Sequence, residues 1–417
     1  MSGAAVRATY LLESYLPLER AAAVVAGEQS SGTFVRVAGE TDELRSRFGA
    51  RVTAIETVES PPGGALPGAV GADGGTLTSG RVTIDLPLEN FGPSIPNLLA
   101  AVTGNLFELR ELAGVRLLDL ELPDAFAAAY PGPQFGPRGT RELMGAGDGI
   151  LIGSIVKPSV GLTPSQTASL VADLADGGAD FVKDDELTAN PPHAPLRERV
   201  RTVMAAVEDS AQRHGRKVMF AFNITDDIGR LREHHDLVLQ AGGTCVMVCV
   251  NSVGLAGLAH LREHARLPIH VHRAGLGALT RSPRLGVAFR AFQKLVRLAG
   301  GDHFHANGMA NKFYETDDEA LEAISALREP LLGGYDCLPV LSSAQWAGTA
   351  PITYERVGST DLLVLAGGGI HAHPGGTAAG VQSIRQGWEA AIAGVPLHEH
   401  AREHAALRQA LEHFAAR

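Results

Sequence analysis

The sequence predicts an α/β protein with a C-terminal (β/α)8 barrel (TIM barrel) and a smaller N-terminal α+β domain of ferredoxin-like type. From residue 148 onward, apolar strand-like segments alternate with amphipathic helical segments, and eight such strands can be counted. A Pro/Gly-rich segment, residues 130–140, separates this regular part from the less regular part before it. No glycine-rich dinucleotide-binding turn follows the first strand of the regular part, which disfavours the alternative architecture, a doubly wound open sheet.

The N-terminal domain is expected over residues 1–140. Alternating and β-branched segments predict its strands, and apolar residues at helical spacing after Pro17 predict its first helix. Residues 60–80 are dense in glycine and proline, so we expect a long loop there. The predicted strands are 7–14, 33–37, 81–86 and 115–120, and the predicted helices are 17–27 and 94–104.

The barrel domain is expected over residues 141–417, with a helical extension from residue 377. The eight predicted strands are 150–156, 180–184, 217–223, 243–250, 268–273, 302–306, 336–342 and 361–366. The helices predicted around them are 164–175 after the capping residue Thr163, 194–213, 226–240, 255–266, 284–298 and 317–328.

The composition excludes few classes of protein but disfavours several. Hydrophobic residues make up 45% of the chain, an ordinary globular value. The net charge of −10, without a basic cluster, disfavours a nucleic-acid-binding protein. Three cysteines are too few for a disulfide framework, which predicts a cytoplasmic protein with Cys245 and Cys249 in the core. We expect no membrane partner, because no cleavable leader or apolar run of spanning length is seen.

Polar residues gather at the predicted carboxyl ends of the barrel strands, where active sites of this fold lie. The second strand ends in Lys183-Asp184-Asp185-Glu186. Because side chains alternate along a strand, Lys183 and Asp185 share one face and Asp184 points to the other. Carboxylates suit Mg²⁺, and the amine of Lys183 becomes an oxygen ligand if it reacts with CO₂ to form a carbamate. Taken alone, the stretch is also compatible with an acidic loop; the polar residues at the other strand ends favour a site.

Those other strand ends suit a phosphorylated substrate. Arg273 and His305 can bind a phosphate, the arginine in bidentate fashion. The glycines 367–369 can expose backbone N–H groups to a second anion, although such a triplet is also common in turns. Lys157 and Lys312 can stabilise an enolate or a carboxylate. Lys312 lies in a loop that can close over the substrate.

Two histidines are expected to be structural. We predict that His270 points to the face opposite His272 and that His303 faces the surrounding helices.

Together these residues resemble the large subunit of ribulose-bisphosphate carboxylase (RuBisCO), and more closely its RuBisCO-like relatives, over nearly the whole chain. The resemblance is carried by Gly153 to Pro158, Gly177 to Glu186, His272-Arg273, Gly301 to His305, Lys312, Ser342, Gly367 to Gly369, His373-Pro374, Glu28 to Thr33 and Gly104-Asn105. It implies a homodimer in which the two N-terminal segments reach the active site of the partner subunit.

The resemblance also implies roles for individual residues. Mg²⁺ would lie on carbamylated Lys183, Asp185 and Glu186, so Mg²⁺ and CO₂ are the implied cofactors. The implied catalytic residues are Lys157, Lys183, His272 and Lys312. The implied substrate- and phosphate-binding residues are Arg273, His305, Ser342, Gly368, Gly369, Glu28, Thr33 and Asn105.

Departures from the carboxylases disfavour CO₂ fixation on ribulose bisphosphate. Ser159 stands where the carboxylases have a second lysine, and Phe34 stands where they have tryptophan. Ser343-Ala344 replaces a glycine pair after Ser342, and the loop around Lys312 lacks the glycine just before the lysine.

The resemblance therefore implies a Mg²⁺-dependent enzyme that forms an enolate of a phosphorylated sugar or sugar acid. Retention of Lys157 and Lys312 favours 3-oxo-isoapionate 4-phosphate as substrate, consumed by decarboxylation or by transcarboxylation and hydrolysis. One alternative is isomerisation or enolisation of methylthio-pentose phosphates in sulfur salvage, although the enolases of that group use a different lysine. The other is a catalytically silent structural or regulatory relative, which the intact metal acids disfavour.

Overall fold

The computed structural model describes residues 4–32, 37–71 and 74–415. The chain forms two compact units, Met1–Pro131 with Gly275–Leu298, and Gly132–Ala274 with Ala299–Arg417. The first unit ends at Pro131, inside the Pro/Gly-rich segment 130–140. Residues 134–136 donate three backbone N–H groups to Oδ1 of Asp302, which lies in the second unit.

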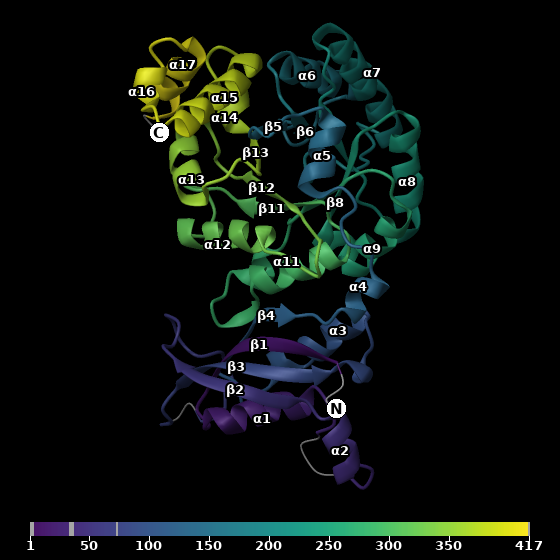
Figure 1. Ribbon diagram of the computed structural model, residues 1–417, viewed down its shortest axis with the longest axis vertical. Coiled ribbons are helices and arrows are strands. Elements are labelled where there is room, and N and C mark those ends of the chain that lie inside the picture. The colour runs from purple at the N-terminus through teal and green to yellow at the C-terminus, as the bar shows by residue number, and fades with distance from the viewer. Residues whose placement is uncertain (1–3, 33–36, 72–73, 416–417) are drawn as a thin grey trace. The chain divides into compact units, whose positions relative to one another are not determined.

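A five-stranded mixed sheet forms the first unit, in the order β10-β4-β1-β3-β2 (Figure 1). The central antiparallel strands bury alternate apolar residues, as their sequences predict; Val6, Ala8, Tyr10 and Leu12 of β1 are all buried. The helix α1 packs against β1, β2 and β3. The strands are β1 Ala5–Ser14, β2 Arg51–Val58, β3 Thr78–Pro87, β4 Gly114–Glu121 and β10 Leu285–Val287, and the helices are α1 Leu18–Glu28, α2 Asp42–Phe48, α3 Ile95–Val102, α4 Ala125–Ala129, α10 Gly277–Thr280 and α11 Phe289–Leu298.

Two elements of this sheet were not predicted. β2 is an edge strand with no buried residue, so its sequence lacks the apolar alternation that marks a half-buried strand. β10 comes from the middle of the barrel sequence and pairs in parallel with β4, in a region predicted as the helix 284–298. Only Phe289–Leu298 of that region is helical. The predicted strand 33–37 lies mostly outside the described residues.

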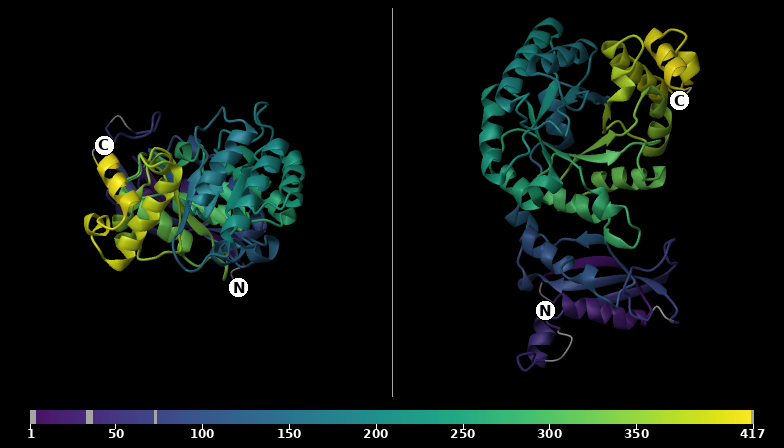
Figure 2. Two further views of the ribbon diagram at one scale, coloured as in Figure 1. Left: turned by 90° about the horizontal axis from the view of Figure 1, so that it is seen from above. Right: turned by 180° about the vertical axis from the view of Figure 1, so that it is seen from behind.

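All eight predicted strands of the barrel are confirmed. They close in the order β11-β12-β13-β5-β6-β7-β8-β9, every pair being parallel. Figure 2 shows the strands of this unit with its helices around them. The strands are β5 Leu151–Ile155, β6 Phe181–Lys183, β7 Met219–Asn223, β8 Cys245–Cys249, β9 Ile269–His272, β11 His303–Asn307, β12 Leu338–Ser342 and β13 Leu363–Ala366. The helices of the unit are α5 Gly136–Met144, α6 Pro164–Asp176, α7 Leu196–His214, α8 Ile228–Gln240, α9 Val250–His264, α12 Asp317–Arg328, α13 Ala350–Val357, α14 Gly368–His371, α15 Thr377–Ala393, α16 Leu397–His400 and α17 Ala405–Phe414.

The barrel interior is apolar on one side and polar on the other. A core cluster joins alternate residues of six strands, among them Leu151, Phe181, Met247 and Val340, with Met144 of α5. Each such side chain contributes about 1.5–3 kcal/mol on full burial. The strands β9 and β11 instead contribute the buried histidines His270, His303 and His305. Hydrophobic burial therefore fixes the barrel, while one sector of its interior is reserved for polar groups.

The burial predicted for two of the cysteines is confirmed. Cys245 and Cys249 are buried in β8, as predicted. Within the described residues, none of the helices combines the length and the apolar character needed to cross a membrane.

Candidate active site

The strand β6 places a lysine and two acids at one end of the barrel. Lys183 and Asp185 are almost fully buried, and Glu186 is partly exposed. Asp184 points the other way, as the alternation predicts, and Nε of Arg199 lies 3.1 Å from each of its carboxylate oxygens. The acid in the middle of the run is thus structural, and the two acids around it remain available for chemistry.

Two lysines and a histidine converge on these two acids. Nζ of Lys157 lies 2.6 Å from Oδ2 of Asp185, and Nζ of Lys183 lies 3.6 Å from Oε2 of Glu186. Nε2 of His272 lies 3.5 Å from the same Glu186 oxygen. Nδ1 of His272 accepts the N–H of Ala274 at 3.1 Å, so Nε2 carries the proton and faces Glu186. The structure therefore brings together five of the predicted site residues.

The environment of Lys183 favours its neutral amine. Burial lowers the pKa of Lys183, against the opposing effect of the Glu186 and Asp185 charges. Nζ of Lys183 donates a hydrogen bond to the carbonyl of Asp184 at 2.9 Å. A neutral amine has the free lone pair that reaction with CO₂ needs, so this lysine suits carbamate formation.

The acids are held by Asn223, at the end of β7. Its side-chain amide donates to the carbonyls of Asp185 at 3.1 Å and Glu186 at 3.3 Å, and its backbone N–H donates to Asp184 at 2.9 Å. The side-chain oxygen of Asn223, Oδ1, accepts hydrogen bonds from both the backbone N–H and the hydroxyl of Thr225. Because the whole side-chain amide of Asn223 is hydrogen-bonded, it restrains the backbone of the two acids.

Four histidine rings form a connected series inside the barrel. His272 contacts His305, His305 contacts His270, and His270 contacts His303, with ring centroids 4.6, 4.8 and 5.6 Å apart. The directions that we predicted for the side chains of His270 and His303 were therefore wrong. Residues two apart on a strand share a face, so His270 follows His272 and His303 follows His305 into the interior. Burial lowers the pKa of all four rings, that of His303 to about 3, so they are neutral near pH 7.

The predicted phosphate ligand Arg273 is paired with an acid. Its guanidinium contacts both carboxylate oxygens of Glu315, at 2.5 and 3.3 Å, and both side chains are mostly buried. The side-chain amide of Asn307 donates to the same carboxylate. Glu315 was missed in the sequence, where it reads as one more acid before the capping residue Thr316 of α12.

The ends of β12 and β13 border the same region. Oγ of Ser342 lies 3.1 Å from Nδ1 of His305. Ser343 and Ala344 have positive φ angles of 76° and 56°, so they keep a backbone conformation that favours glycine. Gly369 is tightly packed, because an added Cβ would lie 2.2 Å from the carbonyl oxygen of Gln345. An added Cβ on Gly368 would meet no atom within 4 Å, so its backbone faces open space.

Four predicted site residues lie elsewhere or outside the described residues. Lys312 is exposed in the loop after β11, with its ammonium 5.3 Å from the ring centre of Phe313. In the described part of the chain it forms no ion pair. Glu28 and Asn105 lie together in the N-terminal unit, the amide of Asn105 donating to Glu28 at 3.4 Å. Thr33 lies outside the described residues.

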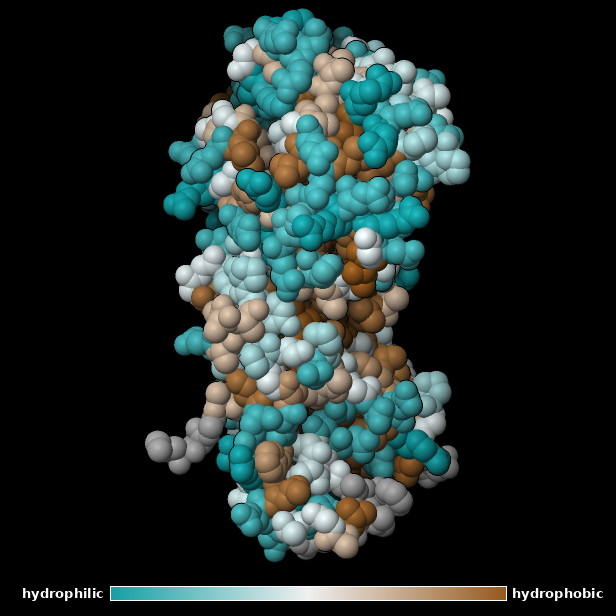
Figure 3. Space-filling view, turned by 90° about the vertical axis from the view of Figure 1, so that its right-hand side faces the viewer, coloured by the Kyte–Doolittle hydropathy of each residue, from teal (hydrophilic) through white to brown (hydrophobic). Residues whose placement is uncertain are grey.

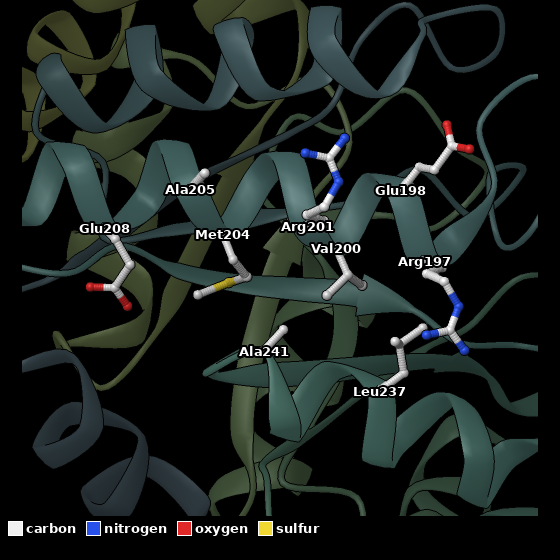
Figure 4. A pocket seen from close by; sticks show the side chains of 9 residues that line it. All are labelled: Arg197, Glu198, Val200, Arg201, Met204, Ala205, Glu208, Leu237 and Ala241. Atoms are coloured by element: carbon white, nitrogen blue, oxygen red, sulfur yellow. The ribbon is translucent and has the colours of Figure 1, made fainter.

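A hollow lies between the helices α7 and α8, on the outside of the barrel. It has a volume of about 570 Å³ and is lined by apolar residues such as Val200, Met204 and Leu237, with Arg197, Arg201 and Glu208 around them (Figure 4). Figure 3 shows the side of the molecule that carries these helices, where hydrophobic and hydrophilic residues are mixed. We place the active site at the strand ends because the lysines, acids and histidines converge there.

The chain is similar to known proteins over nearly its whole length. Residues 8–126 match the family model of the ribulose bisphosphate carboxylase large chain, N-terminal domain, and residues 137–414 match that of its catalytic domain. The chain is 49% identical over 408 residues to 3-oxo-isoapionate-4-phosphate transcarboxylase/hydrolase of Xanthobacter autotrophicus, covering 97% of this chain and 98% of that protein. It is 43% identical over 410 residues to 3-oxo-isoapionate-4-phosphate decarboxylase of Rhizobium rhizogenes, covering 98% of each. The crystal structure of a rubisco-like protein from Burkholderia fungorum superposes with a TM-score of 0.91 at 44% identity, covering 98% of this chain and all of that one.

Proposed function

The chain belongs to the ribulose bisphosphate carboxylase large-chain family, and we propose that it is an enzyme acting on 3-oxo-isoapionate 4-phosphate. It would remove or transfer the carboxylate of that substrate, by decarboxylation or by transcarboxylation and hydrolysis. The observation that carries the proposal is the convergence of Lys157 and Lys183 on Asp185 and Glu186. Relatives with these two activities each align with nearly the whole chain.

The reaction needs an enolate and then a proton. When a β-keto acid loses CO₂, the C–C bond breaks and its electron pair remains on the carbon next to the ketone. That carbon must then be protonated. Nζ of Lys157, held by Asp185 and by Oγ of Ser159 at 2.8 Å, would donate this proton. Lys312 would bind the departing carboxylate when its loop closes.

The substrate has one phosphate, which we assign to the triglycine end of the site. Gly368 exposes its backbone to open space at the start of α14. An added Cβ on Gly367 would lie 3.5 Å from Cε of Lys157, so the glycines lie beside the proposed proton donor. A phosphate bound there would place the reacting carbons near Nζ of Lys157.

The residues present fit a Mg²⁺ ion on a lysine carbamate. The donor set is two carboxylates and a buried amine whose pKa is lowered by burial. Carbamate formation joins Nζ of Lys183 to the carbon of CO₂ and releases one proton from the nitrogen. Lys183, Asp185 and Glu186 would then hold Mg²⁺, which supplies positive charge to the developing oxygen anion when it is bound.

Replacement of the buried lysine tests the proposal. We expect Lys183→Ala to abolish turnover of 3-oxo-isoapionate 4-phosphate, because it removes the carbamate nitrogen. Wild-type activity should require both Mg²⁺ and bicarbonate. Lys217→Ala is the matched control, since Lys217 pairs with Glu208 on the helical surface. Full activity of Lys183→Ala would rule out the carbamate mechanism.

Substrate labelled with ¹³C in the carboxylate separates the two reactions. A decarboxylase releases the label as CO₂, whereas a transcarboxylase/hydrolase retains it in a product carboxylate. Methylthio-ribulose 1-phosphate should be tested in parallel, and its rapid turnover would replace our proposal with a sulfur-salvage function.

We also propose that two copies share their active sites, as the resemblance implies. Glu28 and Asn105 would then complete the site of the partner subunit. Co-expression of Glu28→Gln with Lys183→Ala should restore part of the activity that each variant lacks alone, because mixed dimers contain one intact site. No restoration would argue that each chain forms its site alone.

A further inference from the structure

The ion pair between Arg273 and Glu315 occupies the position where the sequence predicts a phosphate. Both side chains are mostly buried, with 13% and 8% of their surface exposed. The contact is bidentate, at 2.5 and 3.3 Å, so it uses the same guanidinium geometry that would bind a phosphate. The arginine is therefore already provided with an anion from its own chain.

Glu315 is held in place by a second group. The side-chain amide of Asn307, the last residue of β11, donates to its Oε2. The backbone of Asn307 is fixed in turn by the barrel, where it lies opposite Ser342 of β12. The carboxylate thus rests between an arginine from the end of β9 and an amide from the end of β11, and it does not depend on a single flexible contact.

A second phosphate would meet this carboxylate. To bind Arg273, a phosphate must displace Glu315 or lie beside it, and like charges repel strongly at partly buried positions. A neutral or hydroxylated end of a substrate meets no such repulsion. The triglycine end of the site carries no acid of this kind among the contacts of the described residues, so it remains suited to one phosphate.

We propose that Glu315 determines substrate specificity by excluding bisphosphorylated sugars in favour of monophosphorylated ones. This inference rests on the proposed function for the identity of the substrate, but the exclusion itself is a property of binding. Glu315 lies 42 positions after Arg273 in the sequence, so the sequence alone does not show that the two residues form a pair.

Binding measurements test the proposal without requiring turnover. Ribulose 1,5-bisphosphate and ribulose 5-phosphate would be titrated by calorimetry into the full-length protein with Mg²⁺ and bicarbonate. In Glu315→Gln we expect affinity for the bisphosphate to rise at least about tenfold, because an arginine freed of its carboxylate gains a charge-assisted partner. Affinity for the monophosphate should change less than about threefold, since its phosphate binds elsewhere.

Asp318→Asn is the matched control. It removes the same charge three residues further along, from an exposed ion pair with Arg356. It should leave both affinities unchanged. An equal rise for both ligands in Glu315→Gln, or no rise for the bisphosphate, would overturn the proposal.

A second variant keeps the test decisive if Glu315→Gln does not fold. Asn307→Ser removes the amide that holds Glu315, and we expect it to raise bisphosphate affinity selectively but less strongly. If the proposed function is wrong, the protein will not turn over the sugar-acid phosphate, but Glu315→Gln will still raise its affinity for the bisphosphate more than its affinity for the monophosphate.

Discussion

Arg199 of α7 organises the loop that presents the metal acids, and its replacement by methionine makes this role measurable. The side chain is fully buried and contacts the carboxylate of Asp184. Its remaining N–H groups donate to the carbonyls of Thr188, Ala189 and Ala194, at 3.3, 2.5 and 2.6 Å. One guanidinium therefore joins the end of β6 to the whole segment that leads into α7.

The expected loss of stability follows from what the variant leaves behind. Methionine fills much of the volume but supplies no donor, so Asp184 becomes a buried acid without its ion-pair partner. Removing one member of a buried pair costs about 3–5 kcal/mol. Two of the three carbonyls are only partly buried, so water can replace their lost partners, and we expect the total to stay within this range.

The loss should depend on pH with a defined sign. Burial already raises the pKa of Asp184 with Arg199 present, and removal of the arginine raises it further. Between the unfolded pKa of about 4 and the higher folded pKa, the folded protein binds more protons than the unfolded protein. Stability then falls as pH rises through this interval, so the deficit of the variant is smaller at pH 5 than at pH 8.

Urea denaturation of wild type and Arg199→Met at both pH values would measure these effects. Arg197→Met, on the exposed side of the same helix, is the control and should change stability by less than about 0.5 kcal/mol. A loss below about 1 kcal/mol for Arg199→Met, or a larger deficit at pH 5 than at pH 8, would refute the reasoning.

Two further predictions concern the support of the site. Asn223→Ala should weaken Mg²⁺ binding by about 10–100-fold, because it removes the amide that holds the backbone carbonyls of both acids. Calorimetry would measure the affinity, and Asn90→Ala is the control, since the amide of Asn90 is exposed and donates to the carbonyl of Phe48. Equal Mg²⁺ affinities of the two variants would contradict the prediction. Ala344→Gly should stabilise the protein by up to about 1 kcal/mol in urea denaturation, because it relieves a positive φ. Ala205→Gly, inside α7, should instead destabilise by about 1 kcal/mol, and a loss of similar size in Ala344→Gly would show that its backbone carries no strain.

Much of the barrel was predictable because its signals are local. Each strand is a short apolar run between helices of the right length, and each strand end carries its own polar residues. The alternation along β6 correctly separated Asp184 from Lys183 and Asp185. We misapplied the same rule to His270 and His303, which lie two residues from His272 and His305 and therefore share their face, and so we wrongly predicted that they point away from the barrel interior.

The parts that escaped prediction depend on distant partners. β2 is exposed, so nothing in its own sequence reports the neighbour that makes it a strand. β10 is three residues long and owes its conformation to β4, more than 160 positions earlier. The Arg273–Glu315 pair likewise joins a strand end to a loop, and nothing in the sequence near either residue indicates that the two are in contact.

The contribution of residues 275–298 to the N-terminal sheet has a consequence for synthesis on the ribosome. The sheet lacks its outer strand until β10 has emerged, by which time five strands of the barrel are already made. During that interval the edge of β4 is unpaired, and the carboxylate of Glu13 lacks Arg284, which contacts it at 2.6 Å in the complete fold. A nascent chain arrested before residue 284 should therefore expose an N-terminal unit that proteases cleave and chaperones bind, and one released after residue 298 should not.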